Sequence, residues 1–153
     1  MVRRPSLRAG HARAERGASA VEFALIAMPI LVLLFGMVQY GLYFWAMQGG
    51  SDIARSAARS ASVGDPADCA AFREAIRGEV NDLTGSGATA QITRTYVRQK
   101  AGEVTIGDRV EVRVRFKSID MHFPFIPFIN DGMVTAEAES RVDYVPSQPE
   151  TCS

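Results

Sequence analysis

Several residue types that functional sites depend on are scarce in this sequence of 153 residues. It has two cysteines and two histidines, His11 and His122, which are too few and too far apart for a zinc site. It contains no glycine-rich phosphate loop and no nucleophile elbow. Lysines and arginines number 17 and acidic residues also 17, so the basic excess typical of nucleic-acid-binding proteins is missing. We therefore predict no enzymatic activity, no catalytic residue, no metal, no cofactor and no nucleic-acid partner.

Charge is also missing from one long stretch of the chain. From Phe23 to Ser51 there is no formally charged residue. Residues 1–17, by contrast, contain five arginines and a single glutamate. The net charge of zero therefore results from a basic leader (residues 1–17), an uncharged segment and an acidic remainder. This segregation excludes a simple soluble globule.

The uncharged stretch includes an apolar run, residues 23–47, that is long enough for a single transmembrane helix. A helix of this length is about 37 Å long, against a hydrocarbon core of about 30 Å. The run is longer than the apolar part of a secretory signal peptide, which indicates a retained anchor. The arginines before it place the N-terminus in the cytoplasm and residues 63–153 outside. Pro29 cannot donate a backbone hydrogen bond, so we expect a kink there.

The junction between leader and apolar run has a distinctive order of residues. Gly17 closes the leader, Ala18 follows, and Glu22 is fifth when counted from Ala18, directly before Phe23. This junction resembles the processing site of type IV pilins and pseudopilins, where a membrane-embedded peptidase cuts after the glycine. With Pro29 and the apolar run, residues 16–60 resemble the TadE-like family, pseudopilins of the tight-adherence (Tad/Flp) pilus machinery.

The resemblance implies a function, a location and partners. The function is that of a structural component of Flp pilus assembly in adherence, cut between Gly17 and Ala18 by prepilin peptidase. The location is the bacterial inner membrane, with residues 63–153, which we call the body, in the periplasm. The partners are the peptidase, other Tad pilus-assembly pseudopilins, inner-membrane platform proteins and membrane lipid. The alternative is a permanently anchored extracytoplasmic binding or scaffold module that is not processed. Whether the protein enters the filament, primes it or scaffolds its assembly stays open.

Glu22 has two interpretations. An acid at the head of an apolar helix is costly in lipid and normally has a partner. The family resemblance implies that this partner is the α-amine created by cleavage, in the same or a neighbouring subunit. The other interpretation is an interfacial side chain placed favourably near a helix N-terminus.

The rest of the chain predicts an α+β fold of pilin-like layout. The long N-terminal helix is expected to cover residues 18–62 and to end at the following glycine and proline. Asp65 is then expected to cap a second, short helix that ends at Thr84. Four strands are predicted: 90–98 from its Thr, Ile, Tyr and Val content, a short one at 104–106, and 109–117 and 134–144 from alternating residues. One apolar and one charged face indicate a small antiparallel sheet that the helices cover on one side only.

Charged side chains line the outer face of this predicted sheet. Arg113, Arg115 and Lys117 resemble an anion site, but acids of the last strand can pair with them across strands. Those acids are Glu137, Glu139 and Asp143. A solvated face is therefore the favoured interpretation.

The apolar segment Met121–Ile129 has two interpretations. Pro124 and Pro127 interrupt it, so it is not a central strand. It either covers the core at the sheet edge or forms an exposed contact surface for a subunit or the membrane.

The two cysteines, Cys69 and Cys152, both lie outside the cytoplasm in this topology, where oxidation is favoured. We predict a disulfide between them, which would tie down the C-terminal tail. Two free thiols and an intermolecular bond are the alternatives.

Overall fold

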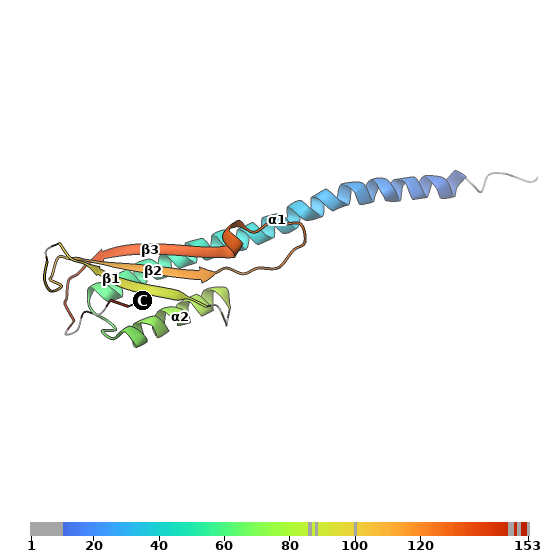
Figure 1. The fold of residues 1–153 in the computed structure, drawn as a ribbon. Coiled ribbons are helices and arrows are strands. Elements are labelled where there is room, and N and C mark those ends of the chain that lie inside the picture. Colours follow the sequence, from blue (N-terminus) through green and yellow to red (C-terminus); the bar gives the residue numbers. More distant parts are fainter. Residues whose placement is uncertain are drawn as a thin grey trace, which may run out of the picture. The chain divides into compact units, whose positions relative to one another are not determined.

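The computed structural model describes residues 11–85, 87, 89–99, 101–146, 149 and 151–152. The order of elements is α1 (His11–Ser62), α2 (Cys69–Thr84), β1 (Gln91–Val97), β2 (Arg109–Lys117), a short 3-10 helix (Ile129–Gly132) and β3 (Met133–Arg141), as Figure 1 shows. This confirms the predicted α+β class, with a long N-terminal helix, a second short helix and an antiparallel sheet. Residues 1–10 of the predicted leader lie outside the described residues.

The chain forms two compact units. The first consists of the chain up to Val38 together with Phe123–Ile126, and the second of Gln39–His122 together with the residues from Pro127 onward. Helix α1 belongs to the first unit before Gln39 and to the second from there on. We describe each unit by itself.

In the first unit, α1 is an exposed helix. It begins at His11, ahead of the predicted start at Ala18, and it continues through Pro29. The expected kink at Pro29 stays a prediction. The aromatic ring of Phe35 stacks on that of Phe123, with 4.7 Å between ring centroids. The apolar run of α1 otherwise exposes its side chains.

Helix α1 ends where the sequence predicted, and the hydrogen bonds show how. Gly64 adopts a φ of 71°, and its N–H donates to the carbonyl of Ala61 over 3.2 Å. The N–H of Asp65 donates to the carbonyl of Ser60 over 3.1 Å. This is the Schellman arrangement, which needs a left-handed residue that glycine adopts without steric cost.

The predicted cap of the second helix was wrong. Asp68, and not Asp65, caps α2, because its carboxylate accepts hydrogen bonds from the N–H groups of Ala70 and Ala71 over 2.8 and 3.3 Å. The N–H of Asp65 is hydrogen-bonded at the end of α1, and the residues between Asp65 and Asp68 turn the chain toward α2. Pro66 therefore lies in the connection rather than in the first turn of α2.

The second unit packs α1 and α2 against the sheet. β2 is the central strand and pairs antiparallel with both neighbours, so that Val114 lies opposite Ile92 on β1 and Ala136 on β3. Most of the largest fully buried apolar side chains come from α2 and β2: Phe72, Val80, Val110, Val112, Val114 and Phe116. Val142, just after β3, and Cys152 of the tail join them. Each such burial contributes roughly 1.5–3 kcal/mol. The strict alternation predicted for 109–117 is confirmed.

Helix α1 contributes small residues to this core, which lets it lie close to the sheet. A Cβ added at Gly50 would lie 2.8 Å from the ring of Phe116. Ala54, Ala58 and Ala61 are fully or almost fully buried on the same helix. The spacing of three and four that the sequence shows is therefore the spacing of a packed helix face.

The predicted short strand at 104–106 is wrong, and Asp108 explains the difference. Its carboxylate accepts hydrogen bonds from the N–H groups of Gln99 and Thr105 over 3.0 and 2.8 Å. These bonds fold the segment into a loop between β1 and β2. Because both stabilise the charged form, they hold the pKa of Asp108 below its usual range.

The last strand is shorter than predicted. β3 ends at Arg141, after which the N–H groups of Asp143 and Tyr144 both turn to the carbonyl of Ser62, over 2.9 and 3.1 Å. The alternation therefore stops: Val142 is buried as predicted, but Tyr144 is 60% exposed and does not point inward.

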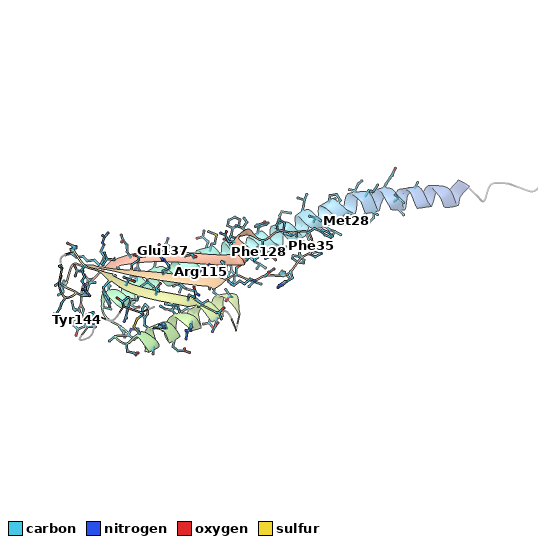
Figure 2. The ribbon with its side chains drawn as sticks, in the orientation of Figure 1. Met28, Phe35, Arg115, Phe128, Glu137 and Tyr144 are labelled. Carbon is cyan, nitrogen blue, oxygen red and sulfur yellow. A yellow bond between two sulfur atoms is a disulfide. The ribbon has the colours of Figure 1, made fainter. Side chains whose placement is uncertain are left out.

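The outer face of the sheet carries cross-strand ion pairs, of which one, Arg113 with Glu137, was predicted. Arg113 of β2 lies 2.7 Å from Glu137 of β3, and Arg109 lies 3.5 Å from Glu139. Arg115 is exposed on the same strand (Figure 2). Such exposed pairs contribute about 0–1 kcal/mol each. They favour a solvated face over an anion site.

Candidate functional site

The predicted processing junction lies on the exposed part of α1. Gly17, Ala18, Glu22 and Phe23 are all exposed, with Phe23 at 74%. Ala18 and Glu22 are one helical turn apart, so they share a face and are about 6 Å apart along the axis. The helix thus brings the position of the expected new amine to the carboxylate that would pair with it.

Nothing in the fold requires a glycine at position 17. A Cβ built on Gly17 meets no atom within 4 Å outside the helix's own nearby backbone. A glycine inside a helix costs about 0.5–1 kcal/mol relative to alanine. Packing therefore does not account for Gly17, in contrast to Gly50, where a side chain would collide with the sheet.

The first unit also carries the candidate membrane span. The part of α1 from Gly17 onward is long and apolar enough to cross a bilayer, and its most apolar stretch is not buried by the rest of the protein. Large apolar side chains exposed along it are Val21, Phe23, Leu25, Ile26, Met28, Ile30, Leu31, Val32, Leu33, Leu34, Phe35, Met37 and Val38. The stretch from Ala18 to Val38 is about 30 Å long, which matches the hydrocarbon core.

From Gln39 onward the body covers one face of α1. Gln39 is 2% exposed and Tyr43 is 7% exposed, whereas Phe44 and Trp45 on the other side remain half exposed. From Gln39 on, the predicted span 23–47 therefore has one face buried by the body and one face exposed. Tyr43 packs into the body.

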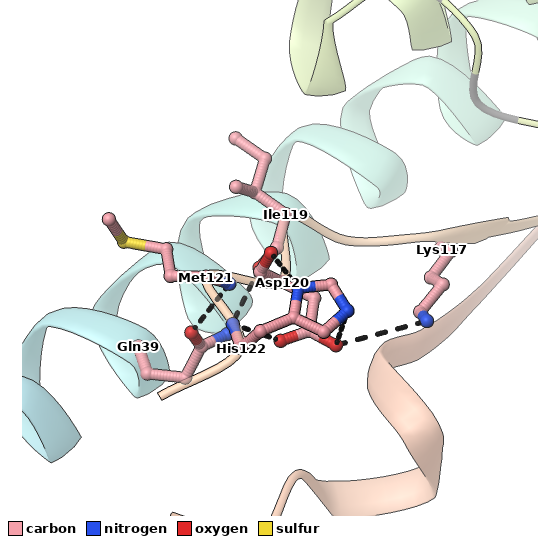
Figure 3. A network of polar contacts seen from close by, with 6 residues as sticks. All are labelled: Gln39, Lys117, Ile119, Asp120, Met121 and His122. Carbon is pink, nitrogen blue, oxygen red and sulfur yellow. Dashed lines mark hydrogen bonds and ion pairs between the residues drawn. The ribbon is translucent and has the colours of Figure 1, made fainter. Parts of the chain in front are cut away.

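Gln39 is a buried anchoring residue that the sequence interpretation missed. Its amide nitrogen donates to the carbonyl of Ile119, and its amide oxygen accepts from the N–H of Met121, both over 3.0 Å (Figure 3). Asp120 lies between these two residues and approaches Lys117 to 3.9 Å. A lone amide side chain within the apolar run was the available signal.

The segment Met121–Ile129 follows directly from this anchor. Phe128 is half-buried and meets the ring of Tyr43 edge-on at 5.7 Å, and the hydroxyl of Tyr40 donates to the carbonyl of Pro127 over 2.7 Å. Phe125, however, is 91% exposed. The end of the segment therefore covers the core, as one interpretation expected, and its middle is exposed. A contact with a subunit or the membrane stays a prediction.

The predicted disulfide between Cys69 and Cys152 is present. It joins the first residue of α2 to the C-terminal tail. The backbone of Cys152 also pairs with Arg94 of β1 through two hydrogen bonds of 2.9 Å. The tail is therefore attached to the sheet and to α2 at the same point.

Arg94 is the second residue that the sequence interpretation missed. Its side chain is fully buried, and its guanidinium donates to the carbonyls of Pro66 and Ala67 over 3.0 Å each. The same group lies 4.6 Å from the centre of the Phe72 ring and 5.7 Å from that of Tyr96. Its position between Ile92 and Tyr96 on the apolar face of β1 was the signal. This arginine fastens the α1–α2 connection to the sheet.

Among the described residues, no group of three histidine, cysteine or acidic side chains could hold a metal ion. A pocket of about 650 Å³ lies between the β1–β2 loop and the end of β3, and Asp108 and Arg141 line it. The Asp108 carboxylate accepts hydrogen bonds from loop N–H groups, and Glu139, which also lines the pocket, pairs with Arg109. The absence of enzymatic activity stays a prediction.

An exposed apolar helix followed by a disulfide-bonded α+β body defines the class: a protein with one helix able to anchor it in a membrane. Residues 17–59, less than half of the chain, match the family model of the TadE-like proteins. The match confirms the resemblance of residues 16–60 to this family and relates the chain to the Tad pilus. No curated protein and no solved structure gives a match.

Proposed function

We propose that this protein is a TadE-like pseudopilin, an inner-membrane structural component of Tad/Flp pilus assembly that prepilin peptidase processes. The observation that carries the proposal is Gly17, a glycine without a packing role at the start of an exposed apolar helix, inside the TadE-like match. A residue without a side chain lets a peptidase approach the backbone closely. The body is then periplasmic, where its disulfide is favoured.

Processing also gives Glu22 a role. Cleavage after Gly17 creates an ammonium on Ala18, one helical turn from Glu22. An ion pair at the edge of the membrane offsets the cost of burying either charge. The amine of a neighbouring subunit can take the same place, which would align helices during assembly.

We expect the mature protein to begin at Ala18. N-terminal sequencing of the membrane-extracted protein, from cells with an active prepilin peptidase, measures this directly. Gly17→Leu should leave the leader attached, because a side chain then blocks access to the peptide bond. Gly36→Leu is the matched control, since Gly36 also lies in open space on α1 and its substitution should leave cleavage unchanged.

An intact leader on the wild-type protein in such cells would contradict this proposal. It would favour the second candidate, a permanently anchored extracytoplasmic scaffold module. That alternative needs neither Gly17 nor Glu22, so neither substitution should then change the protein's behaviour.

We expect Glu22→Ala to insert into the membrane normally but to assemble poorly. Removing the charge makes insertion easier, by up to about 3 kcal/mol at the membrane centre and less near its edge. Pilus output and surface adherence should therefore fall while the amount in the membrane fraction does not. Glu79→Ala removes an exposed acid from α2 and serves as the control. Wild-type pilus output with Glu22→Ala would mean that Glu22 is only an interfacial residue.

A further inference from the structure

The middle of the segment Met121–Ile129 exposes apolar groups that the body does not use. Phe125 is 91% exposed, and Met121 and Ile129 are about half exposed, at 47% and 51%. Phe125 also adopts a φ of 67°, a left-handed conformation that is strained for a bulky residue. A protein does not gain stability in water by holding a phenylalanine in this way, which points to a partner outside the chain.

The tip of the segment, Phe123–Ile126, belongs to the same compact unit as the first part of α1. Phe123, two residues before Phe125, stacks on Phe35 of α1 at 4.7 Å between ring centroids. Phe35 lies within the exposed apolar stretch, one turn before Gln39, where the body begins to cover α1. The tip Phe123–Ile126 therefore lies beside the last turn of the part of α1 that would face lipid.

The composition of the segment suits the boundary between headgroups and acyl chains. Its tip carries no charge, and Pro124 and Pro127 have no N–H group that would need a partner in lipid. Charged and titratable residues flank the tip in the sequence: Asp120 and His122 precede it, and Asp131 follows it. Irregular backbone does not enter the hydrocarbon core deeply, so a shallow depth is expected.

We propose that Met121–Ile129 is a second membrane contact, a loop that inserts Phe125 into the outer headgroup–acyl boundary beside α1. The buried amide of Gln39 positions it by holding Ile119 and Met121 at the start of the loop, and the Tyr40 hydroxyl holds Pro127 at its end. The inference rests on α1 crossing the membrane, which is part of the proposed function.

The test is depth-dependent quenching of tryptophan fluorescence. The single tryptophan is Trp45, so Trp45→Phe provides a silent background. In that background, Phe125→Trp is compared with Leu33→Trp, which marks the exposed face of α1, and with Ile106→Trp, an exposed position of the β1–β2 loop. The full-length proteins are reconstituted in phosphatidylcholine vesicles that contain lipids brominated at successive depths of the acyl chain.

We expect Phe125→Trp to lose emission most strongly to the shallowest bromines and to emit at shorter wavelength than Ile106→Trp, which should not be quenched. Ile106 lies in the β1–β2 loop of the second unit, so Ile106→Trp reports whether that unit by itself contacts the vesicle. Quenching of Leu33→Trp without quenching of Phe125→Trp would overturn the loop insertion and leave the anchor intact. A blue-shifted but unquenched Phe125→Trp would show a protein contact and would equally overturn it. If neither tryptophan were quenched, the membrane anchor itself would be wrong.

Discussion

Removal of the Cys69–Cys152 disulfide should lower the free energy of unfolding of the body by about 3–5 kcal/mol. The bond spans 83 residues of sequence, so it restricts the unfolded chain over most of the body. It also holds the tail in the position where Cys152 pairs with Arg94. Such a loss is a large share of the total stability of a domain this small. Urea denaturation of the detergent-solubilised Cys69→Ser/Cys152→Ser protein measures it.

The wild-type protein with reductant is the matched control and should unfold at the same urea concentration as the double variant. Alkylation of natively purified protein without reductant, followed by mass spectrometry, checks the bond itself. Two alkylated cysteines would contradict the disulfide and would also count against a periplasmic body, because oxidation is favoured there.

The second large effect is expected at Arg94. Arg94→Ala should cost about 3–5 kcal/mol, because it opens a cavity and leaves the carbonyls of Pro66 and Ala67 without their donor. Arg115→Ala on the outer face of the neighbouring strand removes the same side chain from an exposed site and should change stability by less than about 0.5 kcal/mol. Urea denaturation of both variants measures the difference.

Arg94→Met separates packing from hydrogen bonding. Methionine restores most of the volume but donates nothing, so an intermediate loss is expected if the two carbonyls need the guanidinium. A buried charge is itself costly, and an apolar replacement can be neutral in some proteins. Wild-type stability of Arg94→Met would therefore show that the α1–α2 connection holds without this arginine.

A stable body with a fastened tail fits the proposed role. A subunit that is pulled or rotated during filament assembly bears load between its membrane helix and its body. The disulfide and Arg94 fix the α1–α2 connection and the tail to β1. The shallow membrane contact proposed for Phe125 would add a second attachment to the bilayer beside α1.

Local patterns in the sequence determined much of this protein. Apolar residues at spacings of three and four indicated the packed face of α1, and alternation over 109–117 indicated β2 and its buried face. The glycine after Val63 indicated the end of α1, because few other residues adopt the left-handed conformation there. The Gly17–Glu22 junction carried the family resemblance. These signals depend on neighbours in the chain, which a sequence displays directly.

Tertiary structure decided the features that depend on distant partners. Asp68 rather than Asp65 caps α2, because the residues that follow the end of α1 turn the chain before α2 begins. Asp108 folded the expected short strand at 104–106 into a loop. In the sequence, Gln39 and Arg94 look like ordinary polar residues. They are stable as buried anchors because their side chains hydrogen-bond to backbone groups more than twenty residues away along the chain. A polar side chain is stable in a core only when such partners are present, and sequence alone does not show where they will lie.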